Sequence, residues 1–441
     1  MELPRGMKDF DRDEIVKIEF VRQKFLETAK AFGFDLMEPS PIELLDTLEK
    51  KSGSAIKNEI YQFKDKGDRE VALRFDFTVG LTRYVASQKT LKLPAKFSSF
   101  GGVWRYDEPQ KGRYRFFHQW NIETFGNIDS EHDAENIEFT SRLFDNIGLQ
   151  NIVIDINHRR VVQSYIGLCA GLHPDAPALH DVFRAIDKIQ KKSKDEILEE
   201  YEPILGKDAG NVVPREKLEQ VLDAANLKGK PEEVKQEFDR KMAGLGNIES
   251  VLDGWDELCA TYDSLKARGI DNIRINFGIV RGLDYYSGIV FEAFDTTSDL
   301  GALVGGGRYD NLPNAFGRND LGATGVAGGV ERIILRLDEQ GISCIPSNDT
   351  TSVLYVNDEL KSDAINCASK LRKLGITVNI DLTTKSLKKQ MEISSSSKFS
   401  IIFAPEEFAR GHVVLRNMID RTEKQISLDE LITDPKSVLN L

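Results

Sequence analysis

The sequence predicts a mixed α/β (α+β) protein, and three observations lead to that prediction. Strand-like segments occur in pairs over residues 58–77 and about 97–125, which predicts antiparallel hairpins. Charged sequence with helical spacing runs between about 160 and 268, which predicts a helical insertion. Beyond residue 348, strand-like and helical segments alternate as in a small α/β domain. With 441 residues, the chain is long enough for two or three domains.

The N-terminal part begins with an expected helix over residues 11–32, which Gly33 is placed to end. The apolar residues of this segment recur at helical spacing: Ile15, Ile18, Val21, Phe25 and Ala29. An extended segment then turns into a helix around Pro41. In the first hairpin "DKGD" is the expected turn, and in the second "DEPQKGRY" is a long loop.

Strand-like sequence resumes after the insertion with "NIRINFGIV" at 272–280. In "GVAGGVERIILRLDEQG", the spacing of Ile333, Ile334 and Leu337 predicts a helix. A polar linker is expected at 344–352. The C-terminal part should contain strands at "SVLYVN", "ITVNID", "FSIIFAP" and "HVVLRNMI", and helices at 361–374 and near 385–392.

Charge and composition narrow the class of protein. The net charge of −12 argues against nonspecific coating of nucleic acid but permits a local basic patch. Residues 348–441 hold thirteen basic and thirteen acidic residues, so the excess of acid lies in residues 1–347 and the C-terminal part should be a separate domain. No apolar run approaches about 18 residues and the start lacks a signal-like stretch, so we expect a cytoplasmic protein without a membrane span. The four cysteines lack a CxxC pair, which predicts buried free thiols rather than a metal site.

The stretch "RFDFT" combines apolar and polar residues in alternation. In a strand, Phe75 and Phe77 would point one way, into the core. Arg74, Asp76 and Thr78 would then point the other way, toward a cleft. The alternative is an ordinary strand with one solvated face.

The stretch "RFFHQWNIETF" carries large apolar residues on both of its predicted faces. One face includes His118 and Trp120, and His118 is expected to be a packed histidine. A half-buried face that keeps Arg, Gln and Glu is a candidate ligand pocket, unless those groups form a buried salt-bridge network. That second face carries Arg115, Phe117, Gln119, Asn121, Glu123 and Phe125.

Basic residues gather on the loop of this hairpin, where Lys111, Arg113 and Arg115 stand near Arg105 in the sequence. The planar fork of arginine matches phosphate, so the loop is either a phosphate contact or a solvated basic loop. The glycine clusters "GGGRYD" and "GVAGGVER" do not continue into GK[ST], which excludes a Walker-type phosphate loop. "GGVER" opens a helix with Arg332 one turn inside, either beside a ligand or on the surface.

Together these stretches predict a cleft between antiparallel strands, lined by four arginines, two carboxylates and several aromatic rings. Such a cleft suits a polyphosphate beside a small cation, and a nucleoside triphosphate with an amino acid fits that description. The stretch "RGLDYYSGIVFEAF" at 281–294 would bring a further cation and two phenols to the mouth of the sheet.

These motifs resemble those of the histidyl-tRNA synthetases, a family of class II aminoacyl-tRNA synthetases, over essentially the whole chain. "VWRYDEPQKGRYRFFHQ" (103–119) is similar to class II motif 2, and "GVAGGVER" (325–332) is similar to motif 3. Pro41 in "EPSPIELLDT" is the expected proline of motif 1. "RGLDYY" (281–286) and "GGRYD" (306–310) resemble two stretches peculiar to the histidine enzymes.

The resemblance implies a catalytic domain over residues 1–340, an antiparallel sheet flanked by helices. Residues 161–268 would be a helical insertion within it, and residues 348–441 would be the α/β domain that binds the anticodon. The implied reaction joins L-histidine to tRNA(His) at the expense of ATP, through a histidyl-adenylate, releasing AMP and pyrophosphate. Mg²⁺ is implied with ATP, and a homodimer is implied through motif 1.

The resemblance also implies roles for individual residues at the nucleotide. Arg105 would hold the α-phosphate, and Arg113 would contact the outer phosphates. Phe117 and Arg332 would sandwich the adenine. Arg281 would lie against the α-phosphate and the amino-acid carboxylate, where it would stabilise the charge that develops during in-line attack.

Six further residues would line the amino-acid pocket: Asp76, Thr78, Gln119, Glu123, Tyr286 and Tyr309. The first three would receive the ammonium group, and the next two would bind the imidazole. The chain departs from the family pattern at Asp107, expected near ATP, and at Asp76, because many members have glutamate at both places. The charge is kept at each position, while the reach is shorter.

Two alternatives to this enzyme remain. A regulatory subunit of histidine biosynthesis shares the fold but usually lacks the motif arginines and the C-terminal domain. Here all four arginines are present, at positions Arg105, Arg113, Arg281 and Arg332. The other alternative is a sister ligase for a different amino acid, against which "RGLDYY" argues.

Overall fold

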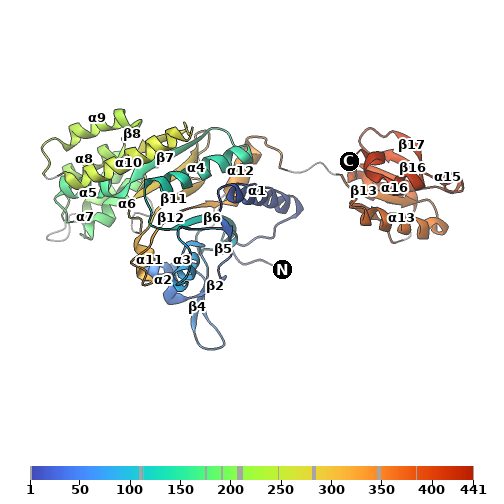
Figure 1. Ribbon diagram of the computed structural model, residues 1–441, viewed down its shortest axis with the longest axis horizontal. Coiled ribbons are helices and arrows are strands. Elements are labelled where there is room, and N and C mark those ends of the chain that lie inside the picture. Colours follow the sequence, from blue (N-terminus) through green and yellow to red (C-terminus); the bar gives the residue numbers. More distant parts are fainter. Residues whose placement is uncertain are drawn as a thin grey trace. The chain divides into compact units, whose positions relative to one another are not determined.

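The computed structural model divides the chain into two compact units, residues 1–345 and 346–441 (Figure 1). No helix among the residues that it describes is both long and apolar enough to cross a membrane. The described residues are 2–108, 112, 114–173, 176–189, 192–205, 212–246, 248–280, 285–344, 349–383 and 385–440.

Unit 1 is built on a nine-stranded sheet with the order β1-β5-β6-β12-β11-β10-β7-β9-β8. All neighbouring pairs are antiparallel except β1 with β5 and β7 with β9, which confirms the predicted mostly antiparallel sheet. Its strands are β1 Asp35–Leu36, β5 Ala95–Trp104, β6 Phe116–Gly126, β7 Ile152–His158, β8 Lys228–Gly229, β9 Ile273–Asn276, β10 Ile289–Asp295, β11 Val304–Arg308 and β12 Gly322–Gly329.

One face of this sheet is covered by helices. Trp120 on β6 packs there between the rings of Phe25 and Phe139, so this face of β6 is core. The helix predicted at 11–32 is confirmed and begins after a capping box at Asp11, although Ile15 is 43% exposed rather than part of the buried stripe. The covering helices are α1 Arg12–Ala31, α4 Ser130–Ile147, α10 Glu249–Ala267 and α12 Val330–Glu339 (Figure 1).

A smaller sheet is formed by the chain between β1 and β5. It has its own apolar core, which includes Leu48 and Phe75. Its order is β2-β4-β3, and the pairing of β3 with β4 confirms the first predicted hairpin. The elements of this part are β2 Ile42–Leu44, α2 Leu45–Ser52, the 3₁₀ helix Gly53–Asn58, β3 Gln62–Lys64, β4 Glu70–Leu73, α3 Thr78–Ser87 and α11 Asn311–Ala315.

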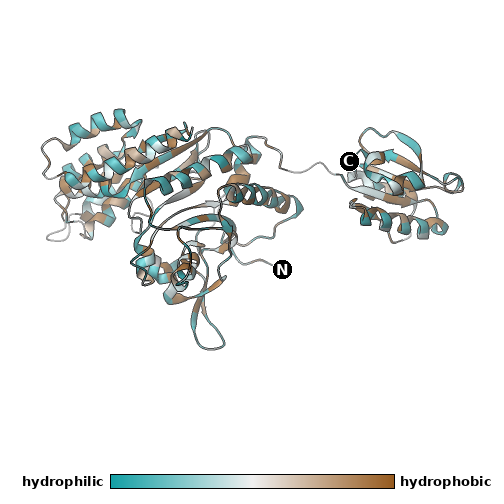
Figure 2. Cartoon of the chain, in the orientation of Figure 1, coloured by the Kyte–Doolittle hydropathy of each residue, from teal (hydrophilic) through white to brown (hydrophobic). Residues whose placement is uncertain are grey.

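Helices predominate between β7 and β9. Figure 2 shows mainly hydrophilic residues along the outer helix α9 and mainly hydrophobic residues along the strands of the large sheet. The rings of Phe238, Trp255 and Phe277 pack together, and α10 also lies against α4, α5 and β7. The helices before α10 are α5 Arg159–Ala170, α6 Ala178–Asp187, α7 Lys194–Leu205, α8 Arg215–Ala225 and α9 Pro231–Met242.

Unit 2 is a five-stranded sheet of order β14-β13-β15-β16-β17, with its own core around Val353, Ile401 and Phe403. The alternation of strand and helix is as predicted, and β17 is an additional strand. All four cysteines are free; three are buried and Cys259 is half-buried. The elements are β13 Thr351–Tyr355, the 3₁₀ helix Asp358–Leu360, α13 Lys361–Lys373, β14 Val378–Ile380, α14 Leu387–Ile393, the 3₁₀ helix Ser394–Ser396, β15 Phe399–Phe403, α15 Pro405–Phe408, β16 His412–Asn417, β17 Glu423–Ser427, α16 Leu428–Thr433 and α17 Pro435–Leu439.

Candidate active site

Two adjoining cavities open on the face of the large sheet opposite to Trp120 and the helices α1, α4, α10 and α12. The larger has a volume of about 260 Å³ and the smaller about 130 Å³. Arg105 and Gln119 line both cavities, so their side chains mark the junction. Arg105 is held there by its own contacts, because its Nε donates to Phe75 O at 3.0 Å and its Nη2 donates to Gln119 Oε1 at 3.1 Å. The site is therefore one cleft with two compartments.

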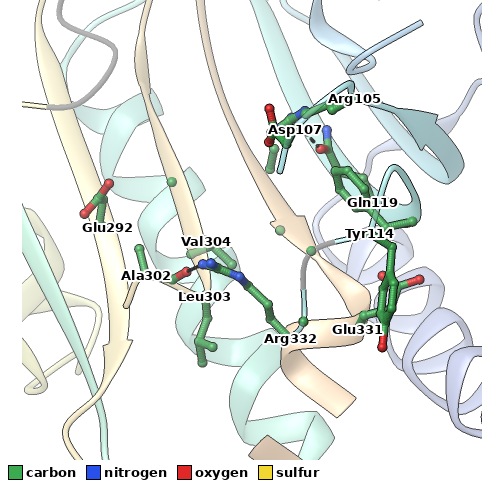
Figure 3. A pocket seen from close by; sticks show the side chains of 16 residues that line it. Arg105, Asp107, Tyr114, Gln119, Glu292, Ala302, Leu303, Val304, Glu331 and Arg332 are labelled. Atoms are coloured by element: carbon green, nitrogen blue, oxygen red, sulfur yellow. Dashed lines mark hydrogen bonds between the residues drawn. The ribbon is translucent and has the colours of Figure 1, made fainter. Parts of the chain in front are cut away.

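The larger cavity, shown in Figure 3, is lined by aromatic and charged side chains. The guanidinium of Arg105 stacks 5.3 Å from the centre of the Phe117 ring. Arg332 comes from the first turn of α12 and donates from Nη1 to Ala302 O at 2.7 Å. Asp107 lies close to Arg105, and Glu292 lies on the opposite wall. Arg332 thus meets Asp107 and Phe117, which lie more than 200 positions earlier in the sequence, in one compartment.

The smaller cavity contains a buried carboxylate, Glu123, which is 1% exposed. Its Oε1 accepts hydrogen bonds from Thr78 Oγ1 at 2.6 Å and from Asn121 Nδ2 at 3.0 Å. Its Oε2 accepts a hydrogen bond from the hydroxyl of Tyr309. A buried charge is tolerated only when it is hydrogen-bonded in this way. The donors fix the orientation of the carboxylate in the cavity wall.

Three tyrosines form another part of the smaller cavity. The rings of Tyr285 and Tyr286 lie 4.2 Å apart, and the Tyr285 ring lies 5.9 Å from that of Tyr309. Burial, reinforced by the charge of Glu123, raises the pKa of Tyr309 well above its ordinary value. Burial raises the pKa of Tyr285 as well. Both hydroxyls therefore stay protonated and remain hydrogen-bond donors at any working pH.

The glycines in "GGGRYD" and "GVAGGVER" serve close packing. Gly325 on β12 pairs with Glu123 on β6, and a Cβ at Gly325 would lie 2.6 Å from Glu123 Cδ. A Cβ at Gly306 would lie 2.7 Å from the ring of Phe291. Bare backbone at these positions leaves the space that the carboxylate and the neighbouring ring occupy.

The face pattern predicted for "RFFHQWNIETF" is confirmed. Phe117, Gln119 and Glu123 line the cleft, while His118 packs on the other side among Phe10, Phe100 and Phe116. His118 Nδ1 also lies 2.9 Å from Glu331 Oε1. Arg115 is the exception on the cleft face, because its guanidinium stacks 3.8 Å from the Tyr106 ring centre and donates to Asp107 O.

The strand predicted for "RFDFT" is wrong. Strand β4 ends at Leu73, and α3 begins at Thr78 after Asp76 Oδ1 has accepted a hydrogen bond from Val79 N at 3.3 Å. Arg74 does not face the cleft, because its guanidinium donates to Pro39 O, Gly102 O and Glu38. Asp76 and Thr78 nevertheless line the smaller cavity, since the turn into the helix points both side chains there.

Three residues that were predicted to contact phosphate groups lie outside the described residues: Lys111, Arg113 and Arg281. Two residues of the site were predicted by their place but were given no role. Asn121 holds both Gln119 and Glu123, with its Oδ1 accepting from Gln119 Nε2 at 2.7 Å, and its place between them on one strand face was the available signal. Tyr285 lines the smaller cavity beside Tyr286 as one of the two phenols predicted at the mouth of the sheet, although only Tyr286 was given a role.

Solved structures share this fold. A histidyl-tRNA synthetase from Nostoc sp. PCC 7120 superposes with a TM-score of 0.80 at 22% identity, over 99% of each chain. A Bacillus halodurans protein described as an ATP phosphoribosyltransferase regulatory subunit/histidyl-tRNA synthetase gives a TM-score of 0.73 at 20% identity, over 92% of this chain and 99% of that one. The fold is that of the class II aminoacyl-tRNA synthetases.

Sequence comparison gives the family within that class. Residues 6–333 match the model of the histidyl-tRNA synthetase family, and residues 350–434 match an anticodon binding domain. A histidine–tRNA ligase from Pyrococcus furiosus is 33% identical over 100% of this chain and 99% of its own length. One from Pyrobaculum neutrophilum is 34% identical over 97% of both chains. The chain belongs to the histidyl-tRNA synthetase family.

Proposed function

We propose that the protein joins L-histidine to tRNA(His) in two steps, through a histidyl-adenylate made from ATP. The observation that carries the proposal is the junction of the two cavities at Arg105. In the first step a carboxylate oxygen of histidine attacks the α-phosphorus of ATP, and the bond to the β-phosphate breaks to release pyrophosphate. This reaction needs a nucleotide compartment and an amino-acid compartment that meet at a cation, and the cleft has that form.

ATP would occupy the larger cavity. Phe117 and Arg332 would take the adenine between a ring and a guanidinium, an arrangement favoured by cation–π attraction. Arg105 would hold the α-phosphate and Arg113 the outer phosphates, because a guanidinium donates two parallel hydrogen bonds to phosphate oxygens. Asp107 would lie beside the phosphates.

Mg²⁺ would enter with ATP. Among the described residues no group of three or more His, Cys, Asp or Glu side chains is arranged to hold a metal ion. Magnesium bound to a nucleotide needs only one or two protein carboxylates in addition to phosphate oxygens and water. Asp107 and Glu292 both line the larger cavity and fit that requirement. The ion would neutralise charge on the phosphates and orient them.

Histidine would occupy the smaller cavity. Its ammonium group needs acceptors, which Asp76, the Thr78 hydroxyl and the Gln119 carbonyl would supply. Its imidazole would lie against Glu123 and Tyr286, with Tyr309 holding the carboxylate of Glu123 in place. An apolar amino acid could not replace the imidazole hydrogen bond, so the buried carboxylate would reject it.

Arg281 would stabilise the pentacoordinate transition state, where negative charge develops on the α-phosphate oxygens. In the second step a hydroxyl of the terminal adenosine of the tRNA would attack the adenylate carbonyl, and AMP would leave.

Residues 1–340 would form the catalytic domain, with 161–268 as an insertion. Residues 348–441 would bind the anticodon, which the separate folding unit and its family match support. Such a protein would act in the cytoplasm, where tRNA is charged.

The enzyme would be a homodimer. Apolar side chains at the β1 edge of the large sheet and on the edge strand β2 of the small one are exposed in the single chain: Leu36 is 57% exposed, Ile42 45% and Leu44 52%. Apolar residues exposed along strand edges are usually covered by a partner. Sedimentation should give twice the mass of the chain, and Leu44→Lys should shift the protein toward monomer. A wild-type monomer at micromolar concentration would rule out the dimer.

The regulatory-subunit alternative predicts no catalysis, so pyrophosphate exchange separates it from the enzyme. The purified protein, ATP, Mg²⁺ and labelled pyrophosphate are mixed with each of the standard amino acids in turn. Exchange that depends on histidine alone supports the proposal. Exchange with another amino acid supports a sister ligase, and no exchange with any supports a regulatory protein.

A further inference from the structure

A cluster of charged residues lies beside the histidine pocket without lining either cavity. Asp133 on α4 is fully buried, and Arg308 at the end of β11 is 7% exposed. Arg308 Nε donates to Asp133 Oδ2 at 3.0 Å, and its Nη1 donates to Glu257 Oε2 at 3.1 Å. Glu257 comes from α10, and its Oε2 also lies 3.2 Å from Nε2 of the buried His158. The guanidinium therefore joins β11 to α4 and α10, and Glu257 extends the cluster to His158 at the end of β7.

The hydrogen bonds fix the protonation of His158 and Glu257. His158 Nδ1 accepts from Arg160 N at 3.2 Å, so the ring proton is on Nε2 and is donated to Glu257. Burial lowers the pKa of His158, which keeps the ring neutral. The hydrogen bond from His158 is the main cause that lowers the pKa of Glu257 to about 2. Burial raises the pKa of Asp133, and the charge of Arg308 opposes that shift. Arg308 is thus a cation between the buried Asp133 carboxyl and an ionised Glu257.

Two glycines, Gly288 and Gly254, allow close packing around the cluster. A Cβ at Gly288 would lie 3.1 Å from Arg308 Cδ, and a Cβ at Gly254 on α10 would lie 2.9 Å from His158 Nδ1. Both contacts are shorter than side chains ordinarily make. The glycines let α10 and the start of β10 approach the guanidinium and the imidazole closely.

The backbone of Arg308 connects this cluster to the histidine pocket. Ser287 N donates to Arg308 O at 2.8 Å, and Ser287 Oγ donates to Asp310 Oδ2 at 2.7 Å. These bonds join the end of β11 to the segment that carries Tyr286. The next residue, Tyr309, donates from its hydroxyl to Glu123. A displacement of Arg308 would therefore move both tyrosines relative to the carboxylate.

We propose that Arg308 is a positioning residue for histidine recognition, and that Glu257 makes its position depend on helix α10. The guanidinium touches neither cavity and acts through Tyr309 and the segment at Ser287. Helix α10 would then support amino-acid selection as well as the packing of the helices around it. This inference rests on the proposed histidine specificity of the smaller cavity.

The test is Glu257→Gln, which keeps the shape of the side chain and removes its charge. Its side chain is 31% exposed, so the variant should fold, which thermal unfolding checks. The histidine KM in pyrophosphate exchange should rise about tenfold, because a hydrogen bond from arginine to a neutral amide oxygen is weaker than one to a carboxylate. The ATP KM should change by less than about twofold, because no cluster residue lines the larger cavity. Glu257→Asp should recover part of the affinity.

Asp256→Asn is the matched control, since Asp256 is an exposed carboxylate on the same helix. It should leave both KM values unchanged. A double-mutant cycle with Tyr309→Phe then measures coupling, and the two effects on the histidine KM should be non-additive if Glu257 acts through Tyr309.

Equal rises in the histidine and ATP KM values, or additive effects in the cycle, would overturn the inference and leave Glu257 as a structural residue. An unchanged histidine KM in Glu257→Gln would overturn it as well. These results are distinct from a failure of the proposed function, because that failure would appear in the wild-type protein as exchange that does not depend on histidine.

Discussion

Gly325 lies on β12 directly opposite Glu123 of β6, so a single added methyl group there tests the histidine pocket. In Gly325→Ala the new Cβ would lie 2.6 Å from Glu123 Cδ and 2.6 Å from Ile122 O, and closer still to Glu123 Oε2. An ordinary contact begins at 3.4 Å, so the carboxylate must move by about 1 Å. The hydrogen bonds from Thr78 and Tyr309 would lengthen or break as it moves.

We expect Gly325→Ala to have a large effect on the kinetics toward histidine and little effect on those toward ATP. A misplacement of about 1 Å can cost about 10²-fold in rate, which corresponds to roughly 2.7 kcal/mol. We therefore expect kcat/KM for histidine in pyrophosphate exchange to fall at least about 100-fold. The ATP KM should change little, since Gly325 does not line the larger cavity. Overpacking should also lower stability by about 1–3 kcal/mol, which thermal unfolding would report.

Gly328→Ala separates displacement of the carboxylate from general strain in β12. A Cβ there would lie 2.5 Å from Trp120 on the opposite, helix-covered face, so it overpacks the same strand without reaching Glu123. Its loss of histidine kcat/KM, measured at saturating ATP, should be far smaller. Similar losses in both variants would show that strain in β12 is responsible. A folded Gly325→Ala protein with near wild-type histidine kinetics would refute the assignment of the pocket.

A chain ending at residue 345 should keep histidine-dependent pyrophosphate exchange but lose most tRNA charging, because unit 2 supplies no lining residue of either cavity. Equal losses of exchange and of charging would contradict this division. Arg332→Ala should raise the ATP KM about tenfold by removing a cation–π contact, with a smaller effect on the histidine KM in the same assay. Arg281→Ala should lower kcat for adenylate formation at least about 10²-fold with smaller changes in KM, and a near wild-type rate in a stable variant would remove its proposed role. The pKa of Tyr309 is raised, so its hydroxyl is lost as a hydrogen-bond donor only above the ordinary tyrosine pKa of 10.0. The ratio of the wild-type kcat/KM for histidine to that of Tyr309→Phe should therefore stay constant up to pH 10.0. A decline of this ratio below pH 10.0 would show that the phenol ionises.

The sequence by itself determined those features that depend on local periodicity. The alternation in "RFFHQWNIETF" assigned Phe117, Gln119 and Glu123 to one face and Trp120 to the other, because a strand turns its side chains by a fixed period of two. Helical spacing likewise located α1 and α12. The same rule failed at "RFDFT", because strand β4 ends at Leu73 and Asp76 accepts a hydrogen bond from Val79 N in the first turn of α3. Such a local hydrogen bond does not show in the alternation of apolar and polar residues.

Only the tertiary structure decided which distant residues meet. Tyr309 lies 186 positions from Glu123 in the sequence, and Arg308 lies 175 positions from Asp133, yet each pair is hydrogen-bonded. The role of Gly325 depends on the cross-strand register that places it opposite Glu123. Periodicity specifies the side of an element that a residue occupies, whereas pairing and packing between elements specify its partner. For that physical reason the sequence indicated the members of the cleft, and the fold determined that Arg105 joins its two compartments.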